Sequence, residues 1–75
     1  MDDELIRSWE NSASTPMNIA ADVAIGIREG RIRAVPPTRE VAQEWDTSPR
    51  TVQRAKKLLE DHGIIKRDAS GYYLP

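Results

Sequence analysis

Apolar residues recur at helical spacing in the first half of the chain. One stripe consists of three residues spaced four apart: Ile19, Val23 and Ile27. Such spacing places them on one face of an amphipathic helix. Thr15 before Pro16 is typical of a helix start, because the hydroxyl can cap free amides and proline lacks only an amide that the helix does not use. Gly30 can take the left-handed conformation that ends a helix. We therefore predict a helix from Thr15 to about Glu29.

A second, shorter helix is predicted from about Thr38 to Trp45. Pro36 and Pro37 prevent an earlier start, and Thr38 is the expected cap. Three residues share its apolar face, with the tryptophan as a core anchor: Val41, Ala42 and Trp45. Asp46 and Thr47 then form a turn.

A third helix is predicted from Ser48 to Asp61 or His62. Ser48 and Pro49 repeat the pairing of a cap and a proline, and Gly63 supplies the stop. On a helical wheel centred on Val52, the core seam is formed by Val52, Ala55 and Leu59, with Leu58 on its flank.

The remaining residues favour a small β-hairpin over residues 64–74. Asp68, Ala69, Ser70 and Gly71 are turn-forming, and the adjacent Tyr72 and Tyr73 should point to opposite faces of a strand. Residues 31–35 can pair with this hairpin as a further short strand, while Ile32 folds back over the preceding helix end. The fold class predicted is α+β, as a winged helix: a three-helix core with a helix-turn-helix, followed by an antiparallel wing.

The first 14 residues differ in character from the rest. They contain four acidic residues against one arginine, and they end in the polar string Asn11-Ser12-Ala13-Ser14. Leu5, Ile6 and Trp9 suffice for one or two amphipathic turns, but an isolated helix of that length is marginal in water. We expect a flexible acidic segment before a domain at residues 15–75. The alternative is that Trp9 packs on the domain or on a second subunit.

Composition limits the classes of function. The chain has 75 residues, no cysteine and one histidine, His62, which is expected simply to occupy a helix end. Neither a disulfide nor a thiolate zinc site is possible. We expect no enzymatic activity, metal or cofactor, because catalytic partners for His62 and a glycine-rich phosphate loop are lacking. The longest apolar runs are far below the ~20 residues of a membrane span, so a cytoplasmic location without membrane contact is expected.

The net charge of the chain does not indicate a nucleic-acid partner, but the positions of its charged residues do. The net charge is -1, but residues 15–75 carry ten lysines and arginines against eight acidic residues. On the third helix, four polar or basic residues fall between roughly 100° and 200° from the core seam: Arg50, Gln53, Arg54 and Lys57. Arginine can read guanine, and glutamine can read adenine, in the DNA major groove. The alternative is an ordinary solvated helix face.

Other residues extend this hypothesis. Arg39 opens the second helix, where a cation opposes the helix dipole, so a phosphate partner would offset that cost. The free backbone amides at the helix N-termini that begin at Thr38 and Ser48 could also bind a phosphate. Lys66 and Arg67 lie before the hairpin tip at Ser70 and Gly71 and could reach the DNA backbone or minor groove. A plain solvent-exposed hairpin is the alternative.

These motifs resemble the winged-helix DNA-binding domain of GntR-type bacterial transcription regulators. The resemblance covers roughly residues 16–74 and is most specific in two blocks, Pro36-x-x-Arg39-Glu40-Val41-Ala42 and Ser48-x-x-Thr51-Val52. It implies DNA contacts from Arg39, from the residues that open the third helix and from the wing tip. Pro49 and Gln53 occupy positions where many members of the family have arginine. We therefore expect the base contacts to come mainly from Arg50 and Arg54 instead. The wing is shorter than the common glycine-x-glycine form.

The sequence thus predicts a double-stranded DNA-binding transcription regulator, acting as a repressor, with residues 48–62 in the major groove and residues 64–74 alongside. The complete set of predicted contacts is Arg39, Thr47, Ser48, Pro49, Arg50, Thr51, Gln53, Arg54, Lys57, Lys66, Arg67, Ser70 and Gly71. Two alternatives stay open: a winged helix used for protein–protein contact, and an accessory or initiator protein of a mobile element. Family members usually continue into a larger dimerising domain, so we expect this chain alone to be monomeric, with dimers formed on DNA or through further sequence.

Overall fold

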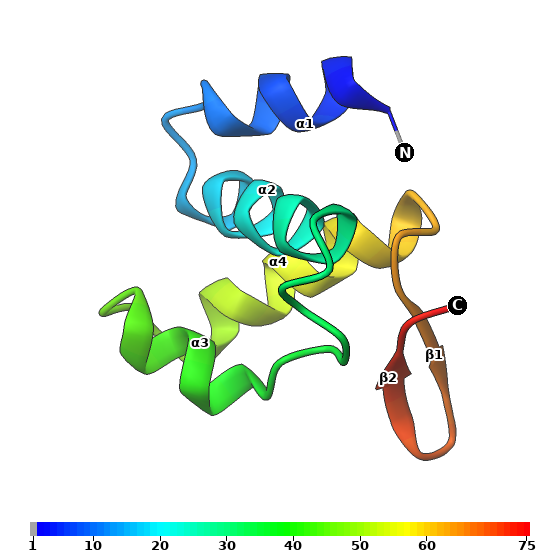
Figure 1. Ribbon diagram of the computed structural model, residues 1–75. Helices are drawn as coiled ribbons and strands as arrows, with labels where there is room; N and C mark the ends of the chain where they lie inside the picture. Colours follow the sequence, from blue (N-terminus) through cyan, green and yellow to red (C-terminus); the bar gives the residue numbers. More distant parts are fainter. Residues whose placement is uncertain (1) are drawn as a thin grey trace.

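Four helices precede a two-stranded antiparallel sheet. The computed structural model describes residues 2–75, and its elements in chain order are α1 (Asp3–Glu10), α2 (Thr15–Arg28), α3 (Thr38–Glu44), α4 (Pro49–Asp61), β1 (Lys66–Asp68) and β2 (Gly71–Tyr73). Figure 1 shows α1, α2 and α4 stacked in layers, with α3 below one end of α4 and the hairpin below the other. The α+β class is therefore confirmed. Among the described residues, every helix is too short or too polar to span a lipid bilayer.

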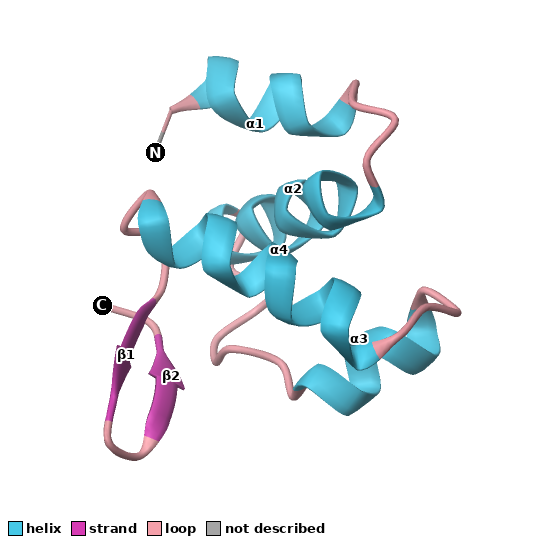
Figure 2. Cartoon of the chain, turned by 180° about the vertical axis from the view of Figure 1, so that it is seen from behind, coloured by secondary structure: helices cyan, strands magenta, loops and turns pink. Residues whose placement is uncertain are grey.

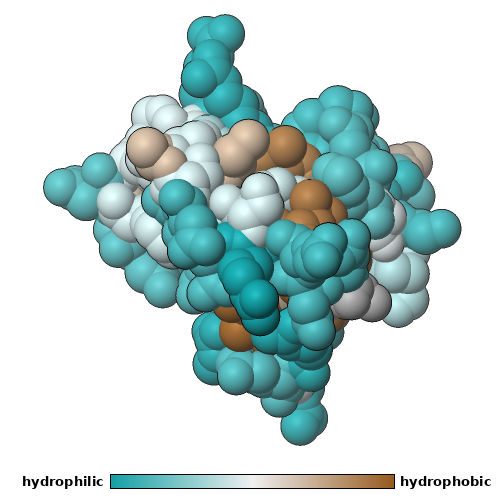
Figure 3. Space-filling view, turned by 90° about the horizontal axis from the view of Figure 1, so that it is seen from above, coloured by the Kyte–Doolittle hydropathy of each residue, from teal (hydrophilic) through white to brown (hydrophobic). Residues whose placement is uncertain are grey.

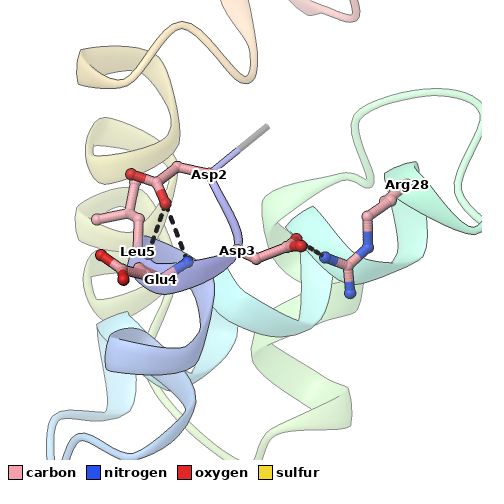
Figure 4. Close-up of polar contacts among 5 residues, drawn as sticks. All are labelled: Asp2, Asp3, Glu4, Leu5 and Arg28. Atoms are coloured by element: carbon pink, nitrogen blue, oxygen red, sulfur yellow. Dashed lines mark hydrogen bonds and ion pairs between the residues drawn. The ribbon is translucent and has the colours of Figure 1, made fainter.

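The N-terminal segment is part of the folded core, so the expectation of a flexible tail is wrong. Helix α1 packs along α2, and the side chains of Ile6 and Trp9 are only 1% and 3% exposed. Asp2 caps the helix, since its Oδ1 accepts hydrogen bonds from the amides of Glu4 (2.9 Å) and Leu5 (3.3 Å) (Figure 4). Docking supplies the stabilisation that so short a helix lacks by itself.

Polar contacts join α1 to α2 at both ends. Asp3 forms an ion pair with Arg28 in the last turn of α2 (Figure 4). At the other end, the Asn18 side-chain amide donates hydrogen bonds to the carbonyls of Trp9 (2.9 Å) and Ser12 (2.9 Å). These are helix-end and linker carbonyls that would otherwise need water. The first 14 residues are thus held against the domain at two points.

Helix α2 begins at Thr15, as predicted, but its N-cap differs from the predicted one. Ser14, not Thr15, is the N-cap, and its side chain makes no capping hydrogen bond, so α2 begins with proline in its first turn but without a hydroxyl cap. The predicted end is confirmed: Gly30 has φ +77°. The Ile32 amide donates to the Gly26 carbonyl (2.9 Å), and a Cβ on Gly26 would collide with the Ile32 side chain. Ile32 therefore does fold back over the helix end.

The same contact explains why residues 31–35 do not form the predicted strand. Within residues 2–75, the sheet contains only β1 and β2. Because the Ile32 amide and side chain are committed to the end of α2, this segment is held there instead of pairing with the hairpin. Pro36 and Pro37, which follow, have no amide to offer a sheet.

The core lies among the four helices. Val52, Ala55 and Leu59 are buried as predicted, and Leu58 lies half-buried beside them. One expectation for α3 is wrong. The N-cap is Pro37 rather than Thr38, and no side chain caps it. Trp45 packs against the core as expected, but it stays half-buried, because α3 is about half as long as α2 and α4 and ends at the surface.

The hairpin forms as predicted, although its strands are only three residues long. Lys66 pairs with Tyr73 and Asp68 with Gly71, which has φ +120°. Ile65 attaches the hairpin to the core and is fully buried. Tyr73 is 42% exposed, whereas Tyr72 is half-buried, so the two tyrosines do take different faces.

The side of the molecule that α1 covers is largely hydrophilic. Figure 3 views this side from above and shows hydrophobic atoms only in small, separate patches. The exposed residues of α1 are polar or charged, including Asp3, Glu4, Arg7 and Glu10. The acidic segment therefore turns its apolar side chains inward and its charges to solvent.

Candidate nucleic-acid interface

Helices α3 and α4 pack together across a tight turn. The amides of Trp45 and Thr47 donate to the carbonyls of Val41 (3.0 Å) and Ala42 (2.9 Å), which closes the end of α3. Asp46 has φ +50°, the left-handed conformation that short polar residues tolerate. Two packed helices joined by such a turn are the arrangement of a helix-turn-helix. In Figure 2 the turn joins the ends of α3 and α4 that lie farthest from the hairpin.

The first turn of α4 is capped by the side chain that immediately precedes the helix. Ser48 Oγ accepts a hydrogen bond from the Thr51 amide (3.2 Å), and the two hydroxyls are 3.1 Å apart. The predicted role of Ser48 as a cap is thus confirmed. Ser48 and Pro49 are exposed, whereas Thr47 and Thr51 are half-buried, so the last two offer less surface to a partner.

The outward face of α4 holds the four residues that the wheel places there. All four are exposed: Arg50, Gln53, Arg54 and Lys57. We call these residues the α4 face. They offer guanidinium, amide and ammonium donors from the first three turns of one helix, and the core seam lies on the opposite side. These donors can form hydrogen bonds with a partner whose surface presents acceptor atoms.

Ion pairing divides the exposed cations near this face into two groups. Within residues 2–75, four of the predicted contact residues have no carboxylate partner: Arg39, Arg50, Arg54 and Lys66. They come from three elements, α3, α4 and β1. Their positive charge is therefore not neutralised within the described part of the chain.

The other two cations are paired with the end of α4. Lys57 Nζ lies 3.0 Å from Asp61 Oδ1, and Arg67 Nε lies 3.7 Å from Glu60 Oε2. The hydrogen bond to Asp61, followed by the charges of Asp61 and Glu60, raises the pKa of Lys57 above its ordinary value. Glu60 thus connects α4 to the hairpin, and the two acidic residues together reduce the free charge of both cations.

The hairpin tip is held by a local network. Asp68 Oδ1 accepts hydrogen bonds from the Ser70 amide (2.8 Å) and hydroxyl (2.6 Å). These bonds stabilise the carboxylate and lower the pKa of Asp68. Ser70 therefore uses its hydroxyl proton within the turn and is a weaker candidate for an outside partner. Lys66 and Arg67 are exposed on β1, while Gly71 is half-buried.

Lys56 is a buried residue that the helical wheel did not identify. It is only 8% exposed, it has no ion pair within residues 2–75, and its ammonium group lies 5.5 Å from the centre of the Tyr72 ring. Arg67 lies 5.5 Å from the same ring. Burial lowers the pKa of Lys56. Its position four residues after Val52 was a sufficient signal, because that spacing places it on the core side of α4.

His62 lies at the C-cap of α4, as expected, but it also contacts the N-terminal helix. Its ring centre is 5.3 Å from that of Trp9, in an edge-to-face arrangement. This contact links α1 to the end of α4. Sequence spacing offered no signal for it, since the two residues are far apart in the chain.

Comparison with known proteins adds no family to this geometry. No protein-family model matches the chain, and no curated protein has a significantly similar sequence.

Proposed function

We propose that this chain binds double-stranded DNA and that its helix-turn-helix and hairpin together act as a winged helix. In this proposal α4 enters the major groove, α3 lies across the phosphate backbone, and the hairpin is the wing beside it. The proposal is supported by the packing of α3 on α4 across the turn at residues 45–48. The hairpin follows directly at the end of α4.

The observation that supports it most strongly is the set of unpaired cations. Arg39, Arg50, Arg54 and Lys66 are exposed and lack carboxylate partners within residues 2–75. Four like charges on adjacent elements repel one another, and they gain a favourable partner when phosphates approach. DNA supplies such phosphates at regular intervals, and the counterions released on binding add to the affinity.

The α4 face suits base reading as well as charge pairing. Arg50 and Gln53 lie near the N-terminal end of α4, where side chains of a recognition helix reach base edges. Arginine can donate two hydrogen bonds to guanine, and glutamine can pair in the same way with adenine. Arg39, on the first turn of α3, suits a phosphate.

We further propose that the chain acts as a transcription repressor in the bacterial cytoplasm. A small domain that occupies a duplex site acts most simply by excluding other proteins from that site.

Substitution of Arg50 and Arg39 separates the two roles. Arg50→Ala should cost about 1–3 kcal/mol on a preferred duplex and much less on unselected DNA, because it removes a contact to a base. Arg39→Ala should weaken all duplexes alike, because it removes a contact to a phosphate. Fluorescence anisotropy with a duplex enriched from a random library, and with the unselected pool, measures both effects.

Arg7→Ala is the matched control, since Arg7 is exposed on α1, which is not among the elements proposed to contact DNA. It should leave both affinities unchanged. An equal loss on selected and unselected DNA for Arg50→Ala would contradict its assignment to base reading.

A further inference from the structure

The hairpin is attached to the rest of the molecule at its base. The amides of Ile64 and Ile65, shortly after α4, donate to the Leu59 carbonyl (2.9 and 3.4 Å), and the Ile65 side chain is fully buried. Beyond this point the two strands extend away from the end of α4 (Figure 2). A pair of three-residue strands has little stability of its own, so a hairpin held only at its base could pivot.

A second attachment lies at Tyr72. The Lys56 ammonium group on α4 and the Arg67 guanidinium group on β1 each lie 5.5 Å from the centre of its ring. Arg67 pairs with Tyr72 across the strands, and Arg67 Nε lies 3.7 Å from Glu60 Oε2 on α4. The face of the hairpin that carries Tyr72 and Arg67 is therefore turned towards α4. A cation near an aromatic ring is attracted by the negative charge of the ring face.

The charge of Lys56 is unusual for its position on α4. Lys56 is buried on the core side of the helix, and no carboxylate pairs with it within residues 2–75. It lines a small apolar crevice together with Val35 and Pro36 of the loop that joins α2 to α3. An apolar side chain would fill this crevice without the cost of burying a charge. What the ammonium group adds is its contact with Tyr72, so the charge acts on the hairpin rather than on the core.

We propose that Lys56 is a positioning residue for DNA binding: through Tyr72 it fixes the angle between the hairpin and α4. Lys66 precedes Arg67 on β1, so it points to the opposite face of the hairpin, where it is exposed and has no ion pair within residues 2–75. A hairpin that pivots about Ile65 would change the position of Lys66 relative to the α4 face. The inference rests on the proposed DNA binding and adds to it a residue that makes no contact with DNA.

Duplex binding by the full chain, measured by fluorescence anisotropy, tests this role. Lys56→Met should weaken binding about two- to fivefold, the scale of one exposed charge contact, because Lys66 is no longer held in place. The loss should be equal on a selected duplex and on the unselected pool, since a contact to phosphate carries no sequence information. Urea unfolding should show that the same variant is more stable than wild type, so the loss does not arise from misfolding.

Two further variants are the controls. Lys56→Arg keeps a cation at the ring of Tyr72 and should bind DNA like wild type. Arg7→Met removes one exposed positive charge from α1 and should also leave the affinity unchanged.

Double variants distinguish positioning from direct contact. If Lys56 acts through Lys66, Lys56→Met should cost little in a Lys66→Ala background, whereas a direct contact of Lys56 with phosphate would cost the same in both backgrounds. The ring is tested in the same way. Tyr72→Phe keeps the ring and should bind like wild type, whereas Tyr72→Leu should reproduce the loss of Lys56→Met. Combining Tyr72→Leu with Lys56→Met should add nothing further.

A measurement without DNA tests the attachment itself. ¹⁵N relaxation gives the order parameters of the backbone amides at residues 66–73 in the free protein. They should be lower in Lys56→Met than in wild type and should return to wild-type values in Lys56→Arg. Unchanged order parameters in α1 and α2 would show that the rest of the fold is intact.

Three results would overturn the proposal: wild-type affinity for Lys56→Met, an equal cost of Lys56→Met with and without Lys66, or unchanged order parameters in the hairpin. The proposed function fails separately. Wild-type protein that binds no duplex would contradict DNA binding itself, and with it any role of Lys56 in binding, even if the order parameters fell as expected.

Discussion

The clearest single-residue consequence of the structure concerns Lys56. Its side chain is only 8% exposed, has no carboxylate partner within residues 2–75 and places its ammonium group over the face of Tyr72. Lys56→Met keeps the length of the side chain and removes the charge. It should raise the free energy of unfolding by about 1 kcal/mol, because desolvation of the charge costs more than the contact with the ring returns. Urea unfolding measures this, with Lys57→Met as the exposed control.

The effect of Lys56 depends on pH in a defined direction. Burial lowers the pKa of Lys56 below its ordinary 10.5. The unfolded chain therefore holds this proton more tightly than the folded chain, and the cost is fully present below the folded pKa. It fades as pH rises from that value towards 10.5. The stability difference between wild type and Lys56→Met should shrink over this range, whereas a constant difference would contradict the account.

Asp61 should limit DNA affinity through Lys57. The carboxylate holds Lys57 Nζ at 3.0 Å, so a phosphate must compete with it. Asp61→Asn should therefore tighten duplex binding at low salt about two- to fivefold, the scale of one exposed ion pair. Glu4→Gln makes the same change of charge on α1 and should have no effect. If both variants gained affinity equally, total charge rather than the Lys57 contact would be responsible.

At the scale of elements, α1 is the part whose role can be measured most simply. Trp9 is 3% exposed and contacts His62, so its removal leaves a cavity between α1 and the rest of the core. Trp9→Ala should lower the free energy of unfolding by about 3 kcal/mol. Ser8→Ala, the exposed neighbour, should change it by less than about 0.5 kcal/mol. Equal urea midpoints for the two variants would mean that α1 is not docked in solution.

Sequence reasoning predicted the elements that have strong local signals. The spacing of Ile19 and Val23, and the stops at Gly30 and Gly63, located α2 and α4 to within a residue or two. The outward placement of Arg50, Gln53 and Arg54 followed from the helical wheel alone. In each case the residues within one or two helical turns were enough to determine the structure.

The predictions failed where contacts between separate parts of the sequence determine the structure. The docking of α1 depends on Asn18, Arg28 and His62, all of which belong to other helices or helix ends. The absence of a strand at residues 31–35 depends on the contact between Ile32 and Gly26. For the candidate site, exposure was predicted, but the pairing of Lys57 and Arg67 by Asp61 and Glu60 became visible only in the structure.

At the scale of the whole molecule, charge is separated between two sides. The exposed surface of α1 carries Asp3, Glu4 and Glu10 against Arg7, whereas the four unpaired cations of the candidate interface lie on α3, α4 and β1. In Figure 1, α1 is at the top and these other elements are below it. An approaching polyanion is therefore attracted to one side and repelled from the other, which orients the molecule even though its net charge is near zero.

The most direct test of the central claim is the salt dependence of duplex DNA binding. Four unpaired cations, with Lys57 or Arg67 joining when a phosphate displaces its carboxylate, correspond to about five phosphate contacts. The slope of log K against log salt concentration should then be about -4 to -5. The double variant Arg39→Ala/Arg54→Ala should reduce the slope by about 2, whereas the double control Arg7→Ala/Arg28→Ala should leave it unchanged. An affinity that does not fall between low and moderate salt, or equal slopes for the two double variants, would contradict DNA binding by this surface.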